Sequence, residues 1–121
     1  MNESEPEKVF RQVFRLQRPS TNYLFVIGQT PSRNKALDLA NTARMLPGVD
    51  SNEVSVLSSA GATQFYITVG GFETAPKAAE TRDELQRTLR EMWKVSGVRT
   101  NAALPFVMRG KVVDAEKLFG E

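Results

Sequence analysis

The chain has 121 residues, enough for one domain whose hydrophobic core needs neither a metal nor a disulfide to hold it together. It contains no cysteine and no histidine, which excludes disulfides, thiol nucleophiles, histidine bases and Cys/His zinc sites. The formal net charge of +2 is a mild, dispersed excess, so it does not predict a nucleic-acid binding tract.

Residues 1–20 predict a linker or a short amphipathic helix, because Ser4 and Glu7 have capping-box spacing and Pro19 marks an end. The N-terminus lacks the basic start and apolar run of a signal peptide, and no apolar run is long enough to cross a bilayer. We therefore expect a soluble chain. A role outside the cytoplasm would need an exporting segment on a longer parent protein.

Two strand-and-helix units follow in chain order. Residues 22–28 predict a strand, and a stripe of alanine and leucine predicts a helix over residues 32–46. Residues 53–57 and 64–69 predict two further strands joined by a flexible turn. The longest helix is expected to begin at Thr74, and a loop follows it.

The two units form a weak internal repeat with an offset of 42 positions, which sets Tyr23 against Phe65 and Gly28 against Gly70. Gly70-Gly71 lacks the Lys-Ser/Thr of a phosphate-binding loop and the spacing of a dinucleotide site. We interpret this glycine pair as a tight corner between strand and helix, with anion binding as the alternative.

The end of the chain completes the fold: residues 105–109 predict a fourth strand, and residues 111–121 predict a short helix or tail. The order strand, helix, strand, strand, helix, strand predicts an α+β domain over residues 21–110. We expect a single four-stranded antiparallel sheet with two helices packed on one face, the βαββαβ plan of RNP and ferredoxin-like folds.

The other face of the sheet is left open, and we call it the outer face. Strict alternation sends five apolar residues toward the helices: Phe25, Ile27, Phe65, Ile67 and Val69. The same alternation sends Leu24, Val26, Tyr66 and Thr68 to the outer face. We expect a ligand to bind there.

The second unit, YITVGGFETAPKAAETRDEL, resembles the signature half of the SPOR domain, a peptidoglycan-binding repeat of bacterial envelope proteins. The matching positions are Val69, Gly70, Gly71, Phe72, Ala78 and Leu85. The first unit matches more loosely, with Thr30 where an aromatic residue is usual. The resemblance covers residues 21 to about 119.

This resemblance implies a non-catalytic binding module of the cell envelope or periplasm, involved in cell division and carried by a membrane-anchored parent protein. Its implied partner is the septal glycan strand of peptidoglycan, stripped of peptides and bound on the outer face. It implies no cofactor and no metal. Val26 stands where the family usually has glutamine, and Tyr66 stands where it often has arginine. Tyr66 adds an aromatic surface on which a sugar ring can lie.

We predict a ligand-binding site of seven residues on or beside the outer face: Leu24, Val26, Gln29, Gln64, Tyr66, Thr68 and Arg109. Tyr66 is the expected stacking surface, and Arg109 is expected near the edge of the fourth strand. The remaining polar residues are expected to contact sugar hydroxyls.

Three alternatives remain open from the residues alone. The apolar pair Leu24 and Val26, or the N-terminal helix, suits a protein-interaction module. An RNA-recognition module shares the fold plan, but Tyr66 is the single aromatic expected on the outer face. A glycosidase would need paired carboxylates, for which Glu73 with Glu53 or Asp50 are the candidates. We expect neither nucleic-acid binding nor catalysis.

Overall fold

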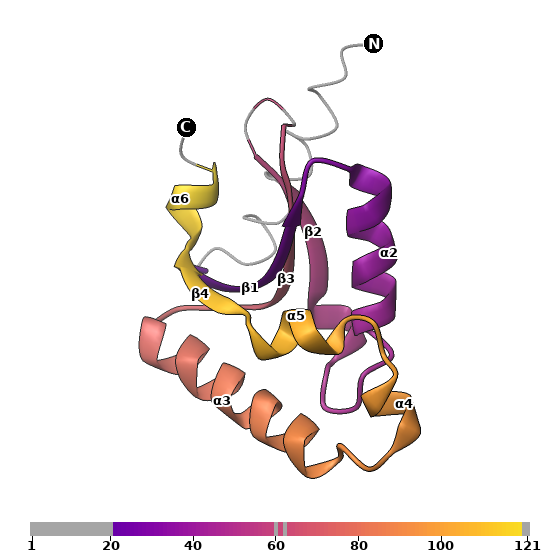
Figure 1. Cartoon of the computed structure of the whole chain (residues 1–121). Helices are drawn as coiled ribbons and strands as arrows, with labels where there is room; N and C mark the ends of the chain where they lie inside the picture. The colour runs from indigo at the N-terminus through magenta and orange to yellow at the C-terminus, as the bar shows by residue number, and fades with distance from the viewer. Residues whose placement is uncertain (1–20, 60, 62, 120–121) are drawn as a thin grey trace.

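The structure is a computed structural model that describes residues 21–59, 61 and 63–119, and the helix expected within residues 1–20 lies outside these residues (Figure 1). The strands are β1 (Tyr23–Thr30), β2 (Val54–Ser58), β3 (Phe65–Phe72) and β4 (Lys111–Asp114). The helices are α2 (Arg33–Ala43), α3 (Ala75–Glu91), α4 (Ser96–Arg99), α5 (Leu104–Met108) and α6 (Ala115–Phe119), and a 3-10 turn, η1, spans Ser51–Glu53. Within these ranges no helix has the length and hydropathy needed to cross a bilayer.

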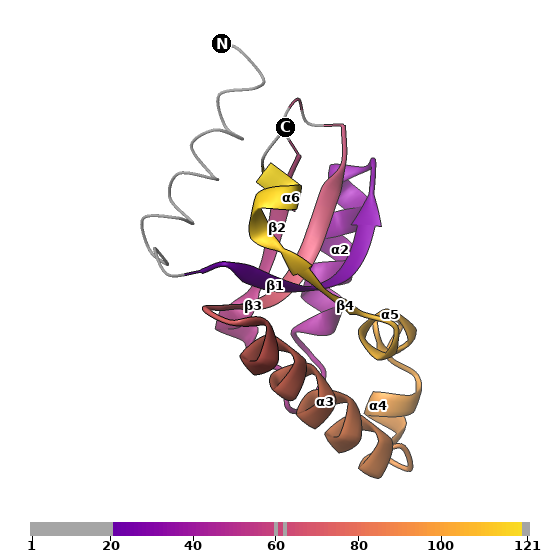
Figure 2. The same ribbon diagram turned by 90° about the vertical axis from the view of Figure 1, so that its left-hand side faces the viewer.

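The four strands form one antiparallel sheet in the order β2-β3-β1-β4. Figure 1 shows α2 on one side of the strands and α6 on the other, and Figure 2 shows the sheet from the side of α6. Both α2 and α3 contact β1 and β3. The predicted α+β fold with a single four-stranded antiparallel sheet is confirmed.

The main core lies between the sheet and the two long helices. Buried side chains come from α2, α3 and the inner face of the strands, and α5 contributes Leu104 and Val107. The predicted burial of four strand residues is confirmed: Phe25, Ile27, Ile67 and Val69, and Leu85 of α3 is buried in the same cluster. The expected burial of Phe65 is wrong. Phe65 is only partly buried, because it pairs with Thr30 and Ser58 at the ends of the neighbouring strands.

Both long helices begin where the sequence predicts a start. Ser32 caps α2, and its side chain accepts a hydrogen bond from the backbone N–H of Lys35 at 3.3 Å. Thr74 caps α3 in the same way, with the N–H of Lys77 at 3.3 Å. Each cap satisfies a backbone donor that the first turn of a helix leaves without a partner.

The fourth strand lies later in the chain than predicted. Residues 105–109 belong to α5 and its C-terminal cap, and the strand is Lys111–Asp114, within the segment expected as a tail. Pro105 occupies the first turn of α5, where a missing N–H costs little, and Gln86 of α3 donates to the carbonyl of Val107 at 3.1 Å. The sheet therefore extends beyond the predicted domain end at residue 110.

Two irregularities interrupt the pairing of β1 with β3. On β1, Val26 pairs with Thr68 and Gly28 pairs with Ile67, so Ile27 is an extra residue. On β3, Gly70 and Gly71 together oppose one residue of β1. The glycine pair therefore lies inside a strand, as a bulge, and its interpretation as a corner before the helix is wrong. Gly70 has φ +72°, a backbone conformation that glycine adopts without strain.

Candidate functional site

The outer face carries one row of side chains that crosses all four strands. Val26 of β1 pairs with Thr68 of β3 and with Lys111 of β4, and Thr68 also pairs with Ser55 of β2. Residues opposite one another in an antiparallel pair point to the same face. The expected outward direction of Val26 and Thr68, away from α2 and α3, is confirmed.

Three of the predicted site residues come together at one end of this face. Gln29 pairs with Tyr66 across β1 and β3, and the Gln29 side-chain amide donates to the side-chain oxygen of Gln64 at 3.3 Å. Gln29 is exposed, whereas Gln64 and Tyr66 are partly buried. We call these three residues the polar end of the outer face. It offers an aromatic ring beside two amides that can donate and accept hydrogen bonds.

Strict alternation along β1 would have placed Gln29 beneath the helices. The extra residue at Ile27 reverses the alternation, so Ile27 and Gly28 both face inward. A side chain at Gly28 would meet Leu39 of α2 at 2.7 Å, which confirms its inward direction. Gln29 reaches the outer face because of this bulge.

Another part of the outer face, which reaches Leu57 beside Tyr66, is covered. A second buried cluster joins Ala115 of α6 to two strand residues, Leu24 of β1 and Leu57 of β2. Val26 and Leu118 pack against it. The expectation that Leu24 and Thr68 are available to a ligand is therefore wrong for this conformation, since both are 0% exposed. Local sequence patterns do not predict this packing, because Leu118 is 94 positions from Leu24.

The basic side chain on the outer face is that of Lys111, whereas the sequence predicts Arg109 there. Arg109 caps the C-terminus of α5, and its side chain donates to the carbonyl of Pro105 at 3.2 Å. Lys111 is exposed on β4 and pairs with Val26, so its side chain lies on the outer face. The placement of Arg109 on the fourth strand is wrong, and Lys111 is the residue that the sequence analysis missed.

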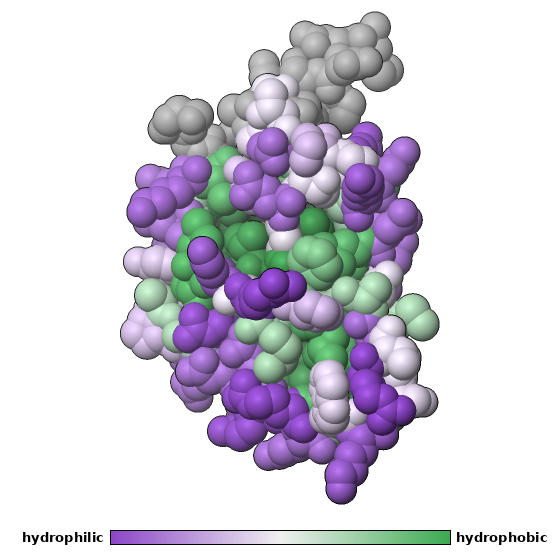
Figure 3. All heavy atoms as spheres, in the orientation of Figure 1, coloured by the Kyte–Doolittle hydropathy of each residue, from purple (hydrophilic) through white to green (hydrophobic). Residues whose placement is uncertain are grey.

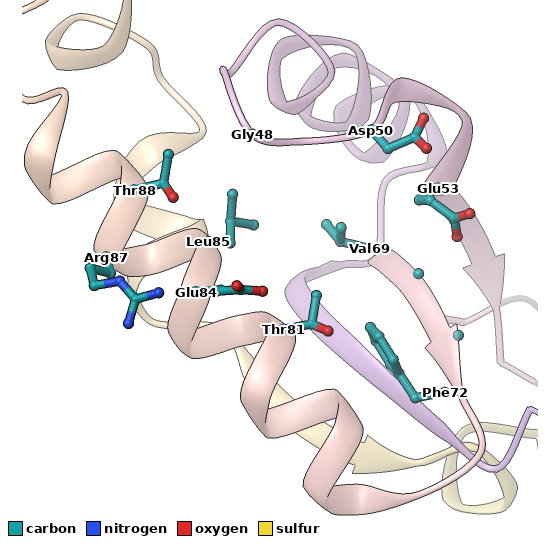
Figure 4. A pocket seen from close by; sticks show the side chains of 12 residues that line it. Gly48, Asp50, Glu53, Val69, Phe72, Thr81, Glu84, Leu85, Arg87 and Thr88 are labelled. Carbon is teal, nitrogen blue, oxygen red and sulfur yellow. The ribbon is translucent and has the colours of Figure 1, made fainter.

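A cavity of about 420 Å³ lies between α3, the β3 bulge and the loop before β2 (Figure 4). Figure 4 shows Asp50 and Glu53 on one wall and Glu84 on α3 opposite them, with Arg87 farther along the helix. With three carboxylates and one guanidinium, the charged side chains that line the cavity repel an anionic ligand more than they attract it. This charge balance argues against the phosphate interpretation of Gly70-Gly71, which line the same cavity.

The carboxylates also bear on metal binding and on the glycosidase alternative. Within the described residues, no group of three or more acidic side chains is arranged to hold a metal ion. Of the candidate pair members, Asp50 and Glu53 line the cavity, whereas Glu73 is not among its lining residues. Glu73 instead uses its backbone carbonyl to accept a hydrogen bond from the Asn22 side chain at 3.1 Å.

Apolar side chains also gather on the side of the molecule shown in Figure 3, between the positions of α6 and α2 in Figure 1. Two large apolar side chains are exposed on elements that border this region, Leu37 of α2 at 40% and Phe106 of α5 at 43%. Exposed apolar surface of this kind is typical of protein contacts.

No protein-family model matches the chain, and no curated protein or solved structure matches it either.

Proposed function

We propose that this chain is a non-catalytic binding module for a peptidoglycan glycan strand, held on the outer face of its sheet. The observation that carries the proposal is the polar end, where Gln29, Gln64 and Tyr66 lie side by side. The resemblance of the second strand-and-helix unit to SPOR domains supports the same ligand.

The chemistry of a sugar suits this arrangement. A pyranose ring has an apolar face edged by hydroxyl groups, so it binds best where an aromatic ring adjoins hydrogen-bonding groups. Tyr66 supplies the ring, and the amides of Gln29 and Gln64 supply donors and acceptors. Lys111 lies on the same face and can donate to a hydroxyl or to a lactyl carboxylate of the glycan.

Co-sedimentation with purified sacculi tests the proposal. The chain should sediment with amidase-treated sacculi, whose glycan is stripped of peptides, and less with untreated ones. The double substitution Tyr66→Ala with Gln29→Ala should weaken retention by about 2 kcal/mol, the loss typical of a binding anchor.

The matched control removes an exposed aromatic ring from another part of the molecule. Phe106→Ala on α5 should leave retention unchanged. Full retention by the double variant, with a parent-like melting temperature, would exclude the polar end as the glycan site. Release of reducing ends from the sacculi would overturn the non-catalytic assignment.

We further propose that the module acts in the periplasm, joined to a membrane through a longer parent protein. Its expected partner is found only in the cell envelope, which is the reason for this location. A fluorescent fusion exported to the periplasm should concentrate at division sites, and Tyr66→Ala with Gln29→Ala should spread it evenly around the cell.

Protein binding is the second candidate function. The observations in its favour are the apolar region of Figure 3 and the exposed apolar side chains of Leu37 on α2 and Phe106 on α5. A protein ligand would be lost on Phe106→Ala and kept by the Tyr66→Ala and Gln29→Ala variant. The two candidate functions therefore predict opposite outcomes for the same two variants.

A further inference from the structure

α6 occupies part of the outer face. Its Ala115 is buried with Leu24 of β1 and Leu57 of β2, and Leu118 packs against this cluster. The cluster is separate from the main core. Figure 2 shows α6 in front of the strands, on the side away from α2. The face proposed to hold a ligand therefore has an occupant from the same chain.

Thr68 lies in the middle of the covered region. Its neighbours across the strands are Val26 and Ser55, so Leu24 and Leu57 lie diagonally on its two sides. Thr68 is 0% exposed, and its Oγ1 has no hydrogen-bond partner among the described residues. A buried hydroxyl without a partner has lost its bonds to water, which disfavours the conformation that buries it.

α6 is attached to the rest of the domain through contacts that lie outside the main core. The helix has five residues, and a helix this short depends on packing for its stability. It follows β4, an edge strand of the sheet. Two hydrogen bonds fix its first residues: the N–H of Ala115 donates to the carbonyl of Asn22 at 2.8 Å, and the N–H of Glu116 donates to Asp114 Oδ1 at 2.9 Å. No described side chain of α6 belongs to the main core.

We propose that α6 is a displaceable cover that competes with the ligand for the outer face. This proposal rests on the proposed function, because the competing ligand is the glycan strand. Displacement of α6 joins Val26 and Thr68 to the polar end and gives the Thr68 hydroxyl a ligand or water as partner. Since apparent affinity scales with the fraction of open molecules, any event that detaches α6 strengthens binding.

Thiol labelling measures the opening without any ligand. The chain has no cysteine, so Thr68→Cys introduces a single thiol beneath the cover. In the Thr68→Cys variant the reaction of this thiol with a thiol reagent should be slow, because α6 covers it. Adding Leu118→Ser should make the reaction about tenfold faster, because it removes a side chain that packs α6 against the sheet. Glu116→Ser, on an exposed position of the same helix, is the control and should leave the rate unchanged.

An unchanged labelling rate in the Leu118→Ser background, with the fold intact by circular dichroism, would overturn the displaceable cover. Binding is then compared in proteins that retain Thr68. Leu118→Ser should bind amidase-treated sacculi about tenfold more tightly than the parent chain, and Glu116→Ser should match the parent.

The labelling and binding experiments together distinguish failure of the displaceable cover from failure of the glycan ligand. Faster labelling with equal binding by Leu118→Ser and the parent would show that α6 moves without competing for the glycan, which overturns the competition. Faster labelling with no binding by any of the proteins would reject the glycan ligand and retain α6 as a displaceable cover.

Discussion

The side-chain amide of Gln29 donates to the side-chain oxygen of Gln64 at 3.3 Å, although the two residues lie 35 positions apart in the chain. The contact depends on the bulge at Ile27, which turns Gln29 to the same face as Tyr66. A backbone irregularity of one residue therefore assembles the polar end. Removal of either amide should affect a ligand on this face more than it affects the fold, because the hydrogen bond between them is exposed to solvent.

The main core should depend on Phe25 far more than on Phe65. Phe25→Ala is expected to lower the free energy of unfolding by about 3–5 kcal/mol, since Phe25 is 0% exposed and its removal leaves a cavity. Phe65→Ala should cost clearly less, because Phe65 is only partly buried. Urea denaturation of both variants measures the difference, and equal losses would contradict the burial described above.

A methyl group at Gly110 should clash with the ring of Phe25. Its Cβ would overlap that ring, and the ring is fixed in the core, so Gly110→Ala should destabilise the chain by about 1–3 kcal/mol. Gly97→Ala is the matched control, because a Cβ there meets no atom within 4 Å and the residue lies in α4. It should be neutral or raise the melting temperature.

The β3 bulge should require glycine at position 70. Gly70→Ala forces an L side chain to φ +72° and places its Cβ 2.9 Å from the Phe72 ring, and the backbone term alone costs about 1–2 kcal/mol. Gly61 has φ +87°, but a Cβ added there would meet no atom within 4 Å, so Gly61→Ala isolates the backbone term. Equal chemical-denaturation midpoints for the two variants would show that the Phe72 contact carries no strain.

Lys111 should matter more than Arg109 for glycan binding. Lys111→Ala removes the cation that lies on the outer face, whereas the Arg109 side chain is held by the Pro105 carbonyl on α5. We expect Lys111→Ala to weaken retention on amidase-treated sacculi by about 1 kcal/mol and Arg109→Ala to leave it unchanged. The reverse order would place the ligand beside α5. Melting temperatures of the two variants serve as the control for folding.

The sequence predicts the parts of the fold that follow from regular spacing. Alternation through Phe25, Ile67 and Val69 predicts the inner face, the stripe of alanine and leucine predicts α2, and Thr74 predicts the start of α3. The strand prediction for residues 105–109 is wrong, because a short apolar run fits a strand or a buried helix equally well.

The candidate site was harder to predict because it depends on contacts between distant residues. The side chains at Tyr23, Phe25 and Ile27 alternate without a visible break, so nothing local marks the bulge that moves Gln29. The packing of Leu118 near Leu24 likewise has no local pattern. Of the three residues of the polar end, Gln64 and Tyr66 follow from strand periodicity, whereas Gln29 does not.

The position of β4 also has a consequence for how the chain folds. Tyr23 pairs with Asp114, 91 positions later, so this side of β1 has no β4 partner until residues 111–114 have been synthesised. Contacts this distant slow folding, and an unpaired strand edge is a template for pairing with other chains. A polypeptide that stops at residue 110 would keep the edge of β1 exposed from Tyr23 to Val26, and it should self-associate in a concentration-dependent way.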